Sequence, residues 1–479
     1  MRPPLSVRRL ICAGAVFGLA GCGAVPPVAT DTLLRTSNTM VVGEKAVANL
    51  PAKMPTVPED PTNFLPASAE SDDPPFAVDR RAMVVRLSET EVVKAVLQRN
   101  PTLEQMRAAA TAAAAKYPQA IALDDPTIAF TTAPGSAWSG NANYAARVEV
   151  AQKLPLSGKR ELRGRVASAE ASAVGRDVDD ARLRLVEAAR TALADYYQAG
   201  RSLTVNDENR ELLREFRKNA QSRYTNGLAP QQDVLQADLE IARQDERAIG
   251  LGRATRVARA RLNTLMHLPP DTAMAEPPEA VGQSTPLPES AKLRESAAAT
   301  RPDVKALSDR IASDEAAVAL AVRDYHPDVE LIAAYDGFWQ GSGGRPLQWQ
   351  VGARVNLPIR TDRRGAAVAE AQARVAQRRA ELARLLDGIA LEVQEAYEQV
   401  REREQIVALF EKTLLPAAAA NVKEAQTAYV NGKVPFVSLV EAQRGLTELK
   451  DRYYESVAEA ARRRATLDRA AGILPAARE

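Results

Sequence analysis

The sequence predicts an α+β protein made of two copies of one unit, each a pair of β-strands joined to a long helical hairpin. Each copy contains runs in which apolar and polar residues alternate, and a long stretch without proline follows them. Landmark residues recur in the same order roughly 200 residues apart, which indicates a tandem duplication of one supersecondary unit. The matching landmarks are Asn100-Pro101 with Arg301-Pro302, Pro126 with Pro327, Leu154-Pro155-Leu156 with Leu357-Pro358-Ile359, and Tyr224-Thr225-Asn226-Gly227 and Pro230 with Tyr429-Val430-Asn431-Gly432 and Pro435.

The N-terminus resembles the signal peptide of a bacterial lipoprotein. Two arginines precede an apolar run at residues 10–20, which suits a signal-peptide core but is too short to span a bilayer. The following Leu19-Ala20-Gly21-Cys22 is similar to a lipobox, whose cysteine becomes the acylated mature N-terminus. This implies a signal peptide at residues 1–21 and, because Gly23 is not aspartate, sorting to the outer membrane. The alternative is a plain secretory signal with an incidental cysteine.

The charge and the cysteine content narrow the possible classes of protein. The mature chain would carry 60 basic against 61 acidic side chains, because three of the 63 Lys and Arg residues lie in the signal peptide. This balance gives no support to nucleic-acid binding. Cys12 lies inside the signal, so Cys22 alone would remain, and no disulfide could form. We therefore expect no cofactor other than the covalent lipid on Cys22, and no metal site.

The first repeat begins after an extended segment. Residues 22–85 are rich in proline, threonine and acidic residues without sustained periodicity, which predicts an acylated N-terminal tether. Ser88 and Glu91 then have capping-box spacing ahead of an apolar run. We place the first repeat at residues 86–282, the second at 283–474 and a C-terminal tail at 475–479.

Each repeat opens with a helix and continues with two strands. The helices are expected at residues 102–123 and 304–325, and the strands at 127–132 with 144–154 and at 329–335 with 347–357. The last strand shows the alternation most clearly, with Trp349, Val351, Ala353, Val355 and Leu357 set against Gln348, Gln350, Gly352, Arg354 and Asn356. This predicts one apolar face and one face that tolerates water.

The alternation alone is equally compatible with a soluble sandwich. However, four strands are too few to close a barrel within one chain, and an open strand edge cannot lie in lipid. If the strands span a membrane, several copies must combine. Val351 would then face lipid, and Arg354 would line water.

A very long helical hairpin follows each strand pair. No proline occurs between Ser157 and Ala229, so a helix at residues 159–224 could run roughly 100 Å at 1.5 Å per residue. Small apolar residues repeat along it with the spacing of a coiled-coil seam. The second copy predicts a helix at residues 363–429, which Pro416 should bend. Glycine and proline after each long helix predict a turn into return helices at residues 231–266 and 436–471.

The hairpin turns carry a more specific resemblance. Residues 224–237, Tyr-Thr-Asn-Gly-Leu-Ala-Pro-Gln-Gln-Asp-Val-Leu-Gln-Ala, and their copy at 429–442 resemble the Tyr-x-x-Gly-x-x-x-x-x-Asp-Val-x-x-Ala tips of the TolC-like outer-membrane efflux proteins. Residues 152–163 are similar to the segment that leads from the barrel of that family into its long helix. The resemblance covers roughly residues 85–474.

The resemblance implies a membrane protein that works as a homotrimer. Four strands from each chain would form a 12-stranded β-barrel in the outer membrane, continued by an α-helical coiled-coil barrel in the periplasm. The chain would be the exit duct of a tripartite efflux pump, with a periplasmic adaptor (membrane fusion) protein and an inner-membrane RND-type pump as partners.

The resemblance also assigns roles to residues at the turns. By motif position, Asp233 and Tyr429 would form the bond that holds the periplasmic gate shut, and Glu441 would belong to a ring of carboxylates there. The sequence departs from the family pattern at Ser438, where an aspartate is common. The adaptor would contact the tips through Tyr224, Gly227, Pro230, Gly432 and Pro435. The alternative is that the two tyrosines pack the helix ends and Asp233 caps a helix.

Two other classes of protein compete with a channel. An enzyme is not expected, because the two histidines, His267 and His326, stand alone beside prolines, and neither a phosphate-binding loop nor a Gly-x-Ser-x-Gly motif occurs. A lipid-anchored coiled-coil scaffold without a pore would explain the long helices, but it would leave the amphipathic strands without a use.

The sequence says less about the cargo of the expected channel than about its fold. The Ser157-Gly158-Lys159-Arg160 turn and the segment at residues 357–363 look closer to the heavy-metal (CzcC-like) branch of the family than to its multidrug channels. Multidrug and type I secretion ducts of the same family are the alternatives.

Overall fold

The computed structural model describes residues 87–134, 138, 145–282, 286–338 and 348–473, all within one unit of the chain, Phe64–Glu479. The expectations for the signal peptide, Cys22, the tether at 22–85 and the tail at 475–479 lie outside these residues.

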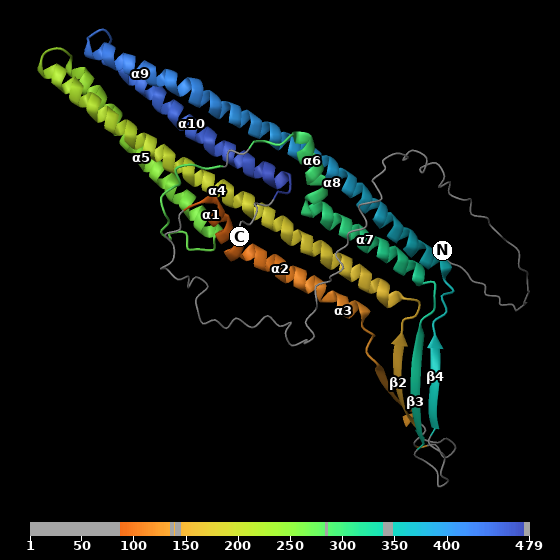
Figure 1. The fold of residues 1–479 in the computed structure, drawn as a ribbon. Coiled ribbons are helices and arrows are strands. Elements are labelled where there is room, and N and C mark those ends of the chain that lie inside the picture. Colours follow the sequence, from red (N-terminus) through yellow and green to blue (C-terminus); the bar gives the residue numbers. More distant parts are fainter. Residues whose placement is uncertain (1–86, 135–137, 139–144, 283–285, 339–347, 474–479) are drawn as a thin grey trace, which may run out of the picture. The chain divides into compact units, whose positions relative to one another are not determined.

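The described elements form two similar repeats, each with helices, then a pair of strands, then a long helical hairpin (Figure 1). The first repeat consists of α1 (Glu89–Arg99), α2 (Pro101–Ala114), α3 (Lys116–Ile121), β1 (Thr127–Thr132), β2 (Ala145–Leu154), α4 (Lys159–Thr225) and α5 (Gln231–Leu265). The second consists of α6 (Ser290–Thr300), α7 (Pro302–Arg323), β3 (Val329–Phe338), β4 (Gln348–Val355), α8 (Thr361–Leu409), a π-helical turn (Phe410–Leu414), α9 (Leu415–Val430) and α10 (Phe436–Ala470). Most boundaries agree with the sequence-based ranges to within two residues.

The single helix expected at residues 102–123 is wrong, because α2 and α3 are separated by a turn at Ala115. Pro118 has no amide hydrogen to donate to the carbonyl of Ala114, and its ring clashes with that carbonyl, so the helix breaks in the turn before the proline. The matching helix α7 has proline only at its first residue, where none of the helix's own hydrogen bonds is lost, and it is continuous.

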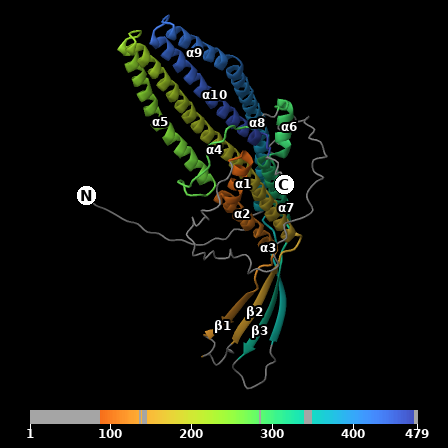
Figure 2. The same cartoon turned by 60° about the vertical axis from the view of Figure 1, so that its left-hand side comes forward.

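The second long helix is interrupted where Pro416 predicts a bend. The π-helical turn Phe410–Leu414 separates α8 from α9, and Pro416 lies in the first turn of α9. A wider turn at this point accommodates a residue that cannot donate a backbone hydrogen bond. Figure 2 shows the change of direction between α8 and α9.

The four strands form one antiparallel sheet in the order β1-β2-β3-β4. Its central pairing joins the two repeats, because β2 pairs with β3 from Ala145 opposite Phe338 to Leu154 opposite Val329. β1 and β4 are therefore the edges of the sheet. Unpaired strand edges present backbone donors and acceptors that can pair with another chain.

The sheet has one apolar and one polar face, as the alternation predicts. Side chains of the apolar face form two rows across the strands, Phe130, Val148, Tyr335 and Trp349 in one and Ile128, Val150, Ala333 and Val351 in the other. This face is uncovered in the single chain, where Val351 is 87% exposed.

Ion pairs cross the polar face of the sheet. The Arg354 guanidinium lies 2.7 Å from the Glu330 carboxylate and 3.7 Å from that of Glu149. The side-chain amide of Gln350 donates a 2.7 Å hydrogen bond to Asp336. Arg354 is therefore on the polar face, as expected.

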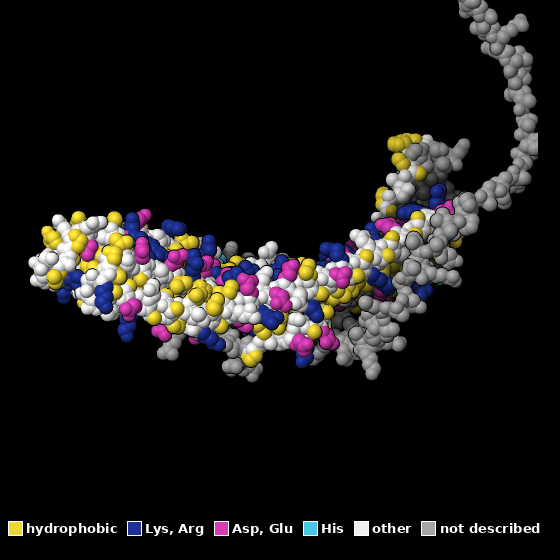
Figure 3. All heavy atoms as spheres, turned by 90° about the horizontal axis from the view of Figure 1, so that it is seen from above, with side chains coloured by type: hydrophobic (Ala, Val, Ile, Leu, Met, Phe, Trp, Pro, Cys, Tyr) yellow, Lys and Arg dark blue, Asp and Glu magenta, His cyan; other side chains and the backbone are white. Residues whose placement is uncertain are grey.

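The long helices lie side by side in the order α5, α4, α10 and α8 with α9 (Figures 1 and 2). α4 packs on both α5 and α10, and α10 packs on α8 and α9. This leaves α5 at one edge of the helical layer and α8 at the other. Basic and acidic side chains are interspersed over the face drawn in Figure 3, without a large basic patch. No helix within the described ranges is long and apolar enough to cross a membrane.

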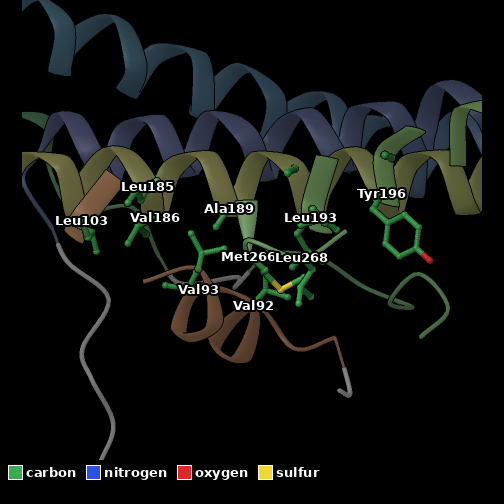
Figure 4. Close-up of a cluster of buried hydrophobic side chains, with 14 of the residues drawn as sticks. Val92, Val93, Leu103, Leu185, Val186, Ala189, Leu193, Tyr196, Met266 and Leu268 are labelled. Carbon is green, nitrogen blue, oxygen red and sulfur yellow. The ribbon is translucent and has the colours of Figure 1, made fainter. Parts of the chain in front are cut away.

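The two repeats bury equivalent cores. In the first, Val92 and Val93 of α1 pack on Leu185, Val186, Ala189 and Leu193 of α4, with Met266 and Leu268 closing the cluster (Figure 4). In the second, Leu293 and Ala297 of α6 pack on Ile389, Val393 and Ala396 of α8. Each fully buried valine or leucine contributes about 1.5–3 kcal/mol.

A buried lysine joins the strands to the helices. Lys159, the first residue of α4, is 3% exposed, and its ammonium lies 2.9 Å from Asp328 and 3.5 Å from Asp324, just before β3. A cation at a helix N-terminus opposes the helix dipole, so the two carboxylates are needed to stabilise it. The ammonium also donates a 3.1 Å hydrogen bond to the backbone carbonyl of His326.

Candidate functional site

The two hairpin turns have the same backbone construction. The amide of Leu228 donates to the carbonyl of Arg223, and that of Gly227 donates to Tyr224, which is a Schellman motif at the end of α4. Lys433 and Gly432 repeat both bonds at the end of α9. Gly227 and Gly432 have φ of +68° and +72°, the left-handed conformation that this motif requires and glycine adopts without strain. Pro230 and Pro435 then precede α5 and α10 in extended conformation.

The structure brings Tyr429 and Asp233 together. The Tyr429 hydroxyl donates a 3.0 Å hydrogen bond to Oδ2 of Asp233, and so links the end of α9 to the first turn of α5. Tyr429 is only 4% exposed, and its ring packs edge-on against Phe436 with centroids 5.3 Å apart. Asp233 lies in the first turn of α5, and the N-cap position itself is occupied by Pro230. The bond therefore joins the two repeats at their turns.

Arg223 completes this contact. Its guanidinium lies 5.1 Å from the centre of the Tyr429 ring, and it donates to the carbonyl of Val430. Burial and the neighbouring Asp233 raise the pKa of Tyr429 to about 12, although Arg223 opposes this shift. Tyr429 consequently remains a hydrogen-bond donor over the whole physiological pH range. The sequence-based reading missed Arg223, which directly precedes the recognised motif.

The other predicted turn residues are not part of this contact. Tyr224 occupies the position in the first repeat that matches Tyr429, but it is 41% exposed. Ser438 stands where the second repeat would match Asp233. Glu441 is exposed on α10, with no hydrogen bond or ion pair to any residue that the structure describes. The two turns thus have the same backbone but different side-chain contacts.

A further ionic contact, made by a buried carboxylate, lies two helical turns along α5 from Asp233. Glu240 of α5 is 2% exposed, and both of its oxygens accept from Arg444 of α10, one of them from Nε at 3.0 Å. Arg243 adds a second ion pair at 2.7 Å. Glu240 is the buried partner, whereas the Arg444 side chain is half exposed, so the two arginines compensate a carboxylate that would be costly to bury alone. This contact is therefore a second connection between the repeats near the turns.

Buried polar side chains also connect α4 and α10 near the Glu240 contact. The Gln443 amide donates to Asn209 at 2.8 Å, and Thr447 is close to the same amide. All three residues are at most 5% exposed. The sequence offered a signal in Asp233, Ala237, Glu240 and Gln244, whose spacing of four, three and four residues puts them on one face of α5. The burial of Glu240 on this face depends on the approach of α10.

Comparisons with known proteins identify this architecture. Residues 92–266 match the family model described as outer membrane efflux protein. Among solved structures, the outer-membrane channel OprN is 20% identical, with a TM-score of 0.67 over 80% of this chain and 89% of that chain. CusC is 14% identical, with a TM-score of 0.68, and the match covers 81% of this chain and 92% of CusC. VceC from Vibrio cholerae is 18% identical, with a TM-score of 0.67, and the match covers 80% of this chain and 96% of VceC. No curated protein sequence matches the chain.

The chain therefore has the fold of the outer-membrane efflux channels, which confirms the TolC-like resemblance at the level of the fold. The family model matches the larger part of its first repeat. This family consists of transport conduits and not enzymes, so the prediction that the chain is not an enzyme is confirmed.

Proposed function

We propose that this chain is the outer-membrane exit duct of a tripartite efflux pump. Three copies would close a 12-stranded barrel in the outer membrane, and their long helices would continue it into the periplasm. The observation that carries the proposal is the open four-stranded sheet, whose Val351 face is uncovered and apolar while its Arg354 face is polar. Such a sheet satisfies its edges and covers its apolar face when copies close a ring in lipid.

The proposed partners come from the resemblance to the efflux family. An inner-membrane RND-type pump would deliver substrate, and a periplasmic adaptor would contact the tips at Tyr224, Gly227, Pro230, Gly432 and Pro435. The Tyr429–Asp233 bond would hold the closed state, and Glu441 would contribute a carboxylate to the entrance. We propose heavy-metal cations as the cargo because the turn at residues 157–160 and the segment at residues 357–363 resemble the heavy-metal branch of the family. Multidrug and type I secretion ducts are the alternatives.

Conductance distinguishes a duct from a scaffold. Purified protein inserted into a planar lipid bilayer is expected to give discrete single-channel current steps. A lipid-anchored coiled-coil scaffold conducts nothing, so a chain that associates with lipid but gives no current steps under any voltage would contradict the proposal.

The lipid anchor has its own test. Cys22→Ser is expected to abolish labelling by radioactive palmitate and to change the processing of the signal peptide, because the acylated thiol would be missing. The barrel can still insert, since its strands do not include residue 22. Palmitate labelling that persists in the variant would exclude the lipobox interpretation.

A further inference from the structure

The second long helix contains a π-helical turn, whereas α4 is α-helical throughout Lys159–Thr225. The stretch from residue 359 to residue 429 is two residues longer than the matching stretch from 156 to 224. A π-helical turn has i→i+5 hydrogen bonds and is wider than an α-helical turn, so it takes up additional length. Here the amide of Leu415 donates to the carbonyl of Phe410, five residues back.

The matching level of α4 is well packed. Counted back from the motif tyrosine, the π-helical turn corresponds to residues 205–209, where α4 is a regular helix and Val205, Asn206 and Asn209 are buried. In the π-helical turn itself, Phe410 is the buried residue of the five. Sharp changes of helix direction occur at such turns. The turn is therefore a weak point in the second long helix, whereas α4 passes this level unbroken.

The helix that follows the turn, α9, is lightly packed. Of its 16 residues, Val422 and Tyr429 are buried. Ala417, Ala419 and Ala420 are exposed, and the side chains of α9 pack mainly on α10. Segments with few buried apolar contacts move at a lower free-energy cost than the core. α9 can therefore move relative to α10 more easily than α4 can.

A hydrogen bond between a tyrosine and a carboxylate fastens α9 at each end. At its far end, the Tyr429 hydroxyl donates to Asp233 at 3.0 Å. At the π-helical turn, the Tyr453 hydroxyl of α10 donates to Oε1 of Glu411 at 2.9 Å. The Tyr453 ring also lies against Phe410, with centroids 6.4 Å apart. The turn is thus held on α10 by a hydrogen bond and an aromatic contact.

The length of α9 converts a small rotation at the turn into a large displacement at its end. Its 16 residues span roughly 24 Å at 1.5 Å per residue. A rotation of roughly 10° about the π-helical turn then displaces the far end by roughly 4 Å. The Tyr429–Asp233 bond is lost much earlier, because a separation of about 3.6 Å is no longer a hydrogen bond.

We propose that α9 is a lever that pivots at the π-helical turn Phe410–Leu414, and that the Tyr453–Glu411 bond restrains this pivot in the closed state. The proposal rests on the proposed exit duct with its Tyr429–Asp233 gate, and it names the element that moves. α4 and α10 are continuous helices at this level and form the fixed frame. Opening then requires no unfolding of a helix, because the changes are confined to the pivot and the two tyrosine bonds.

Loosening the pivot tests the lever in one direction. Tyr453→Phe removes the hydroxyl but keeps the ring, and it should raise the open-to-closed ratio in single-channel recordings about five- to tenfold. Tyr454→Phe is the matched control, because this neighbouring tyrosine makes ring contacts but no hydrogen bond to any residue that the structure describes. It should leave the ratio unchanged. Equal ratios for the two variants would contradict the role of Tyr453.

Locking the pivot tests the lever in the other direction. In a Cys22→Ser chain that also carries the gate changes Asp233→Ala and Tyr429→Phe, the positions of the pivot bond are replaced as Glu411→Cys with Tyr453→Cys. Joining the two thiols with a short, cleavable bis-maleimide should return the open-to-closed ratio to within about threefold of the wild type, and cleavage of the linker should reverse this.

The matched control for the cross-link joins the two helices of the fixed frame. Glu208 of α4 and Lys450 of α10 form an exposed ion pair at 2.9 Å. Glu208→Cys with Lys450→Cys, linked in the same gate variant, should leave the channel open, because neither helix belongs to the lever.

Hydrogen exchange gives a readout that does not depend on current. In the wild type, the amides of residues 411–415 should exchange at least about tenfold faster than the matching amides 206–210 of α4. Equal exchange at the two sites, or a locked gate variant that stays as open as its unlocked form, would overturn the lever and leave the duct proposal standing. A wild-type protein that gives no current steps would instead overturn the duct proposal.

Discussion

The double variant Asp233→Ala with Tyr429→Phe is expected to conduct more than the wild type. It removes a hydrogen bond between an aspartate and a buried tyrosine, a contribution of roughly 1.5–3 kcal/mol. Because an equilibrium constant shifts about tenfold for each 1.4 kcal/mol, the ratio of closed to open channels should fall roughly 10- to 100-fold. Single-channel recordings should show a larger open probability, and cells carrying the variant should admit bulky antibiotics.

Two controls distinguish the loss of the Tyr429–Asp233 bond from general effects of mutations at the turns. Tyr224→Phe removes the matching hydroxyl of the first repeat, which is exposed, and should not open the channel. Glu441→Gln should weaken cation preference and block by divalent ions without opening it. If the double variant forms trimers that conduct like the wild type, the gate assignment fails, and Tyr429 has only a packing role.

The raised pKa of Tyr429 fixes the pH dependence of this bond. A tyrosine whose pKa is higher in the closed, folded state contributes stability that is complete below about pH 10 and is lost as pH rises toward 12. Titration of Tyr429 should therefore not open the channel between pH 6 and 9. Opening should begin only in strongly basic solution.

Val351→Arg is expected to cost roughly 2–4 kcal/mol if residue 351 lies near the middle of the bilayer, because the guanidinium would replace an apolar side chain in lipid. The neighbouring Gln350→Arg is the matched control, since its side chain is on the polar face beside Asp336. The measurement is the temperature at which the trimer dissociates in lipid or detergent. Equal losses for the two variants would contradict the assignment of the faces.

Most of the fold could be predicted from the sequence, because the residues that indicate each element occur in both repeats. The prolines and glycines at both turns, the strand alternation and the proline-free helix at residues 159–224 all occur where the structure has the corresponding element. The exception is the helix expected at residues 102–123, which breaks at Ala115 because Pro118 cannot donate a hydrogen bond to the preceding turn.

The candidate site was only partly predictable. Tyr429 and Asp233 are close in space although 196 residues separate them, and the family resemblance suggested this pair. The Glu240–Arg444 pair could not be found in this way, because charged residues on a long helix look alike whether they face water or another helix. Their burial depends on how α5 and α10 approach each other, which is a property of the tertiary structure.

The number of chains in the particle tests the central claim most directly. The sheet has two free edges and an uncovered apolar face, and closing it as a 12-stranded barrel requires three copies. Native mass spectrometry of detergent-extracted protein should give the mass of three mature chains, each beginning at residue 22 and carrying lipid. A stable monomer that retains full conductance after reconstitution would contradict this account.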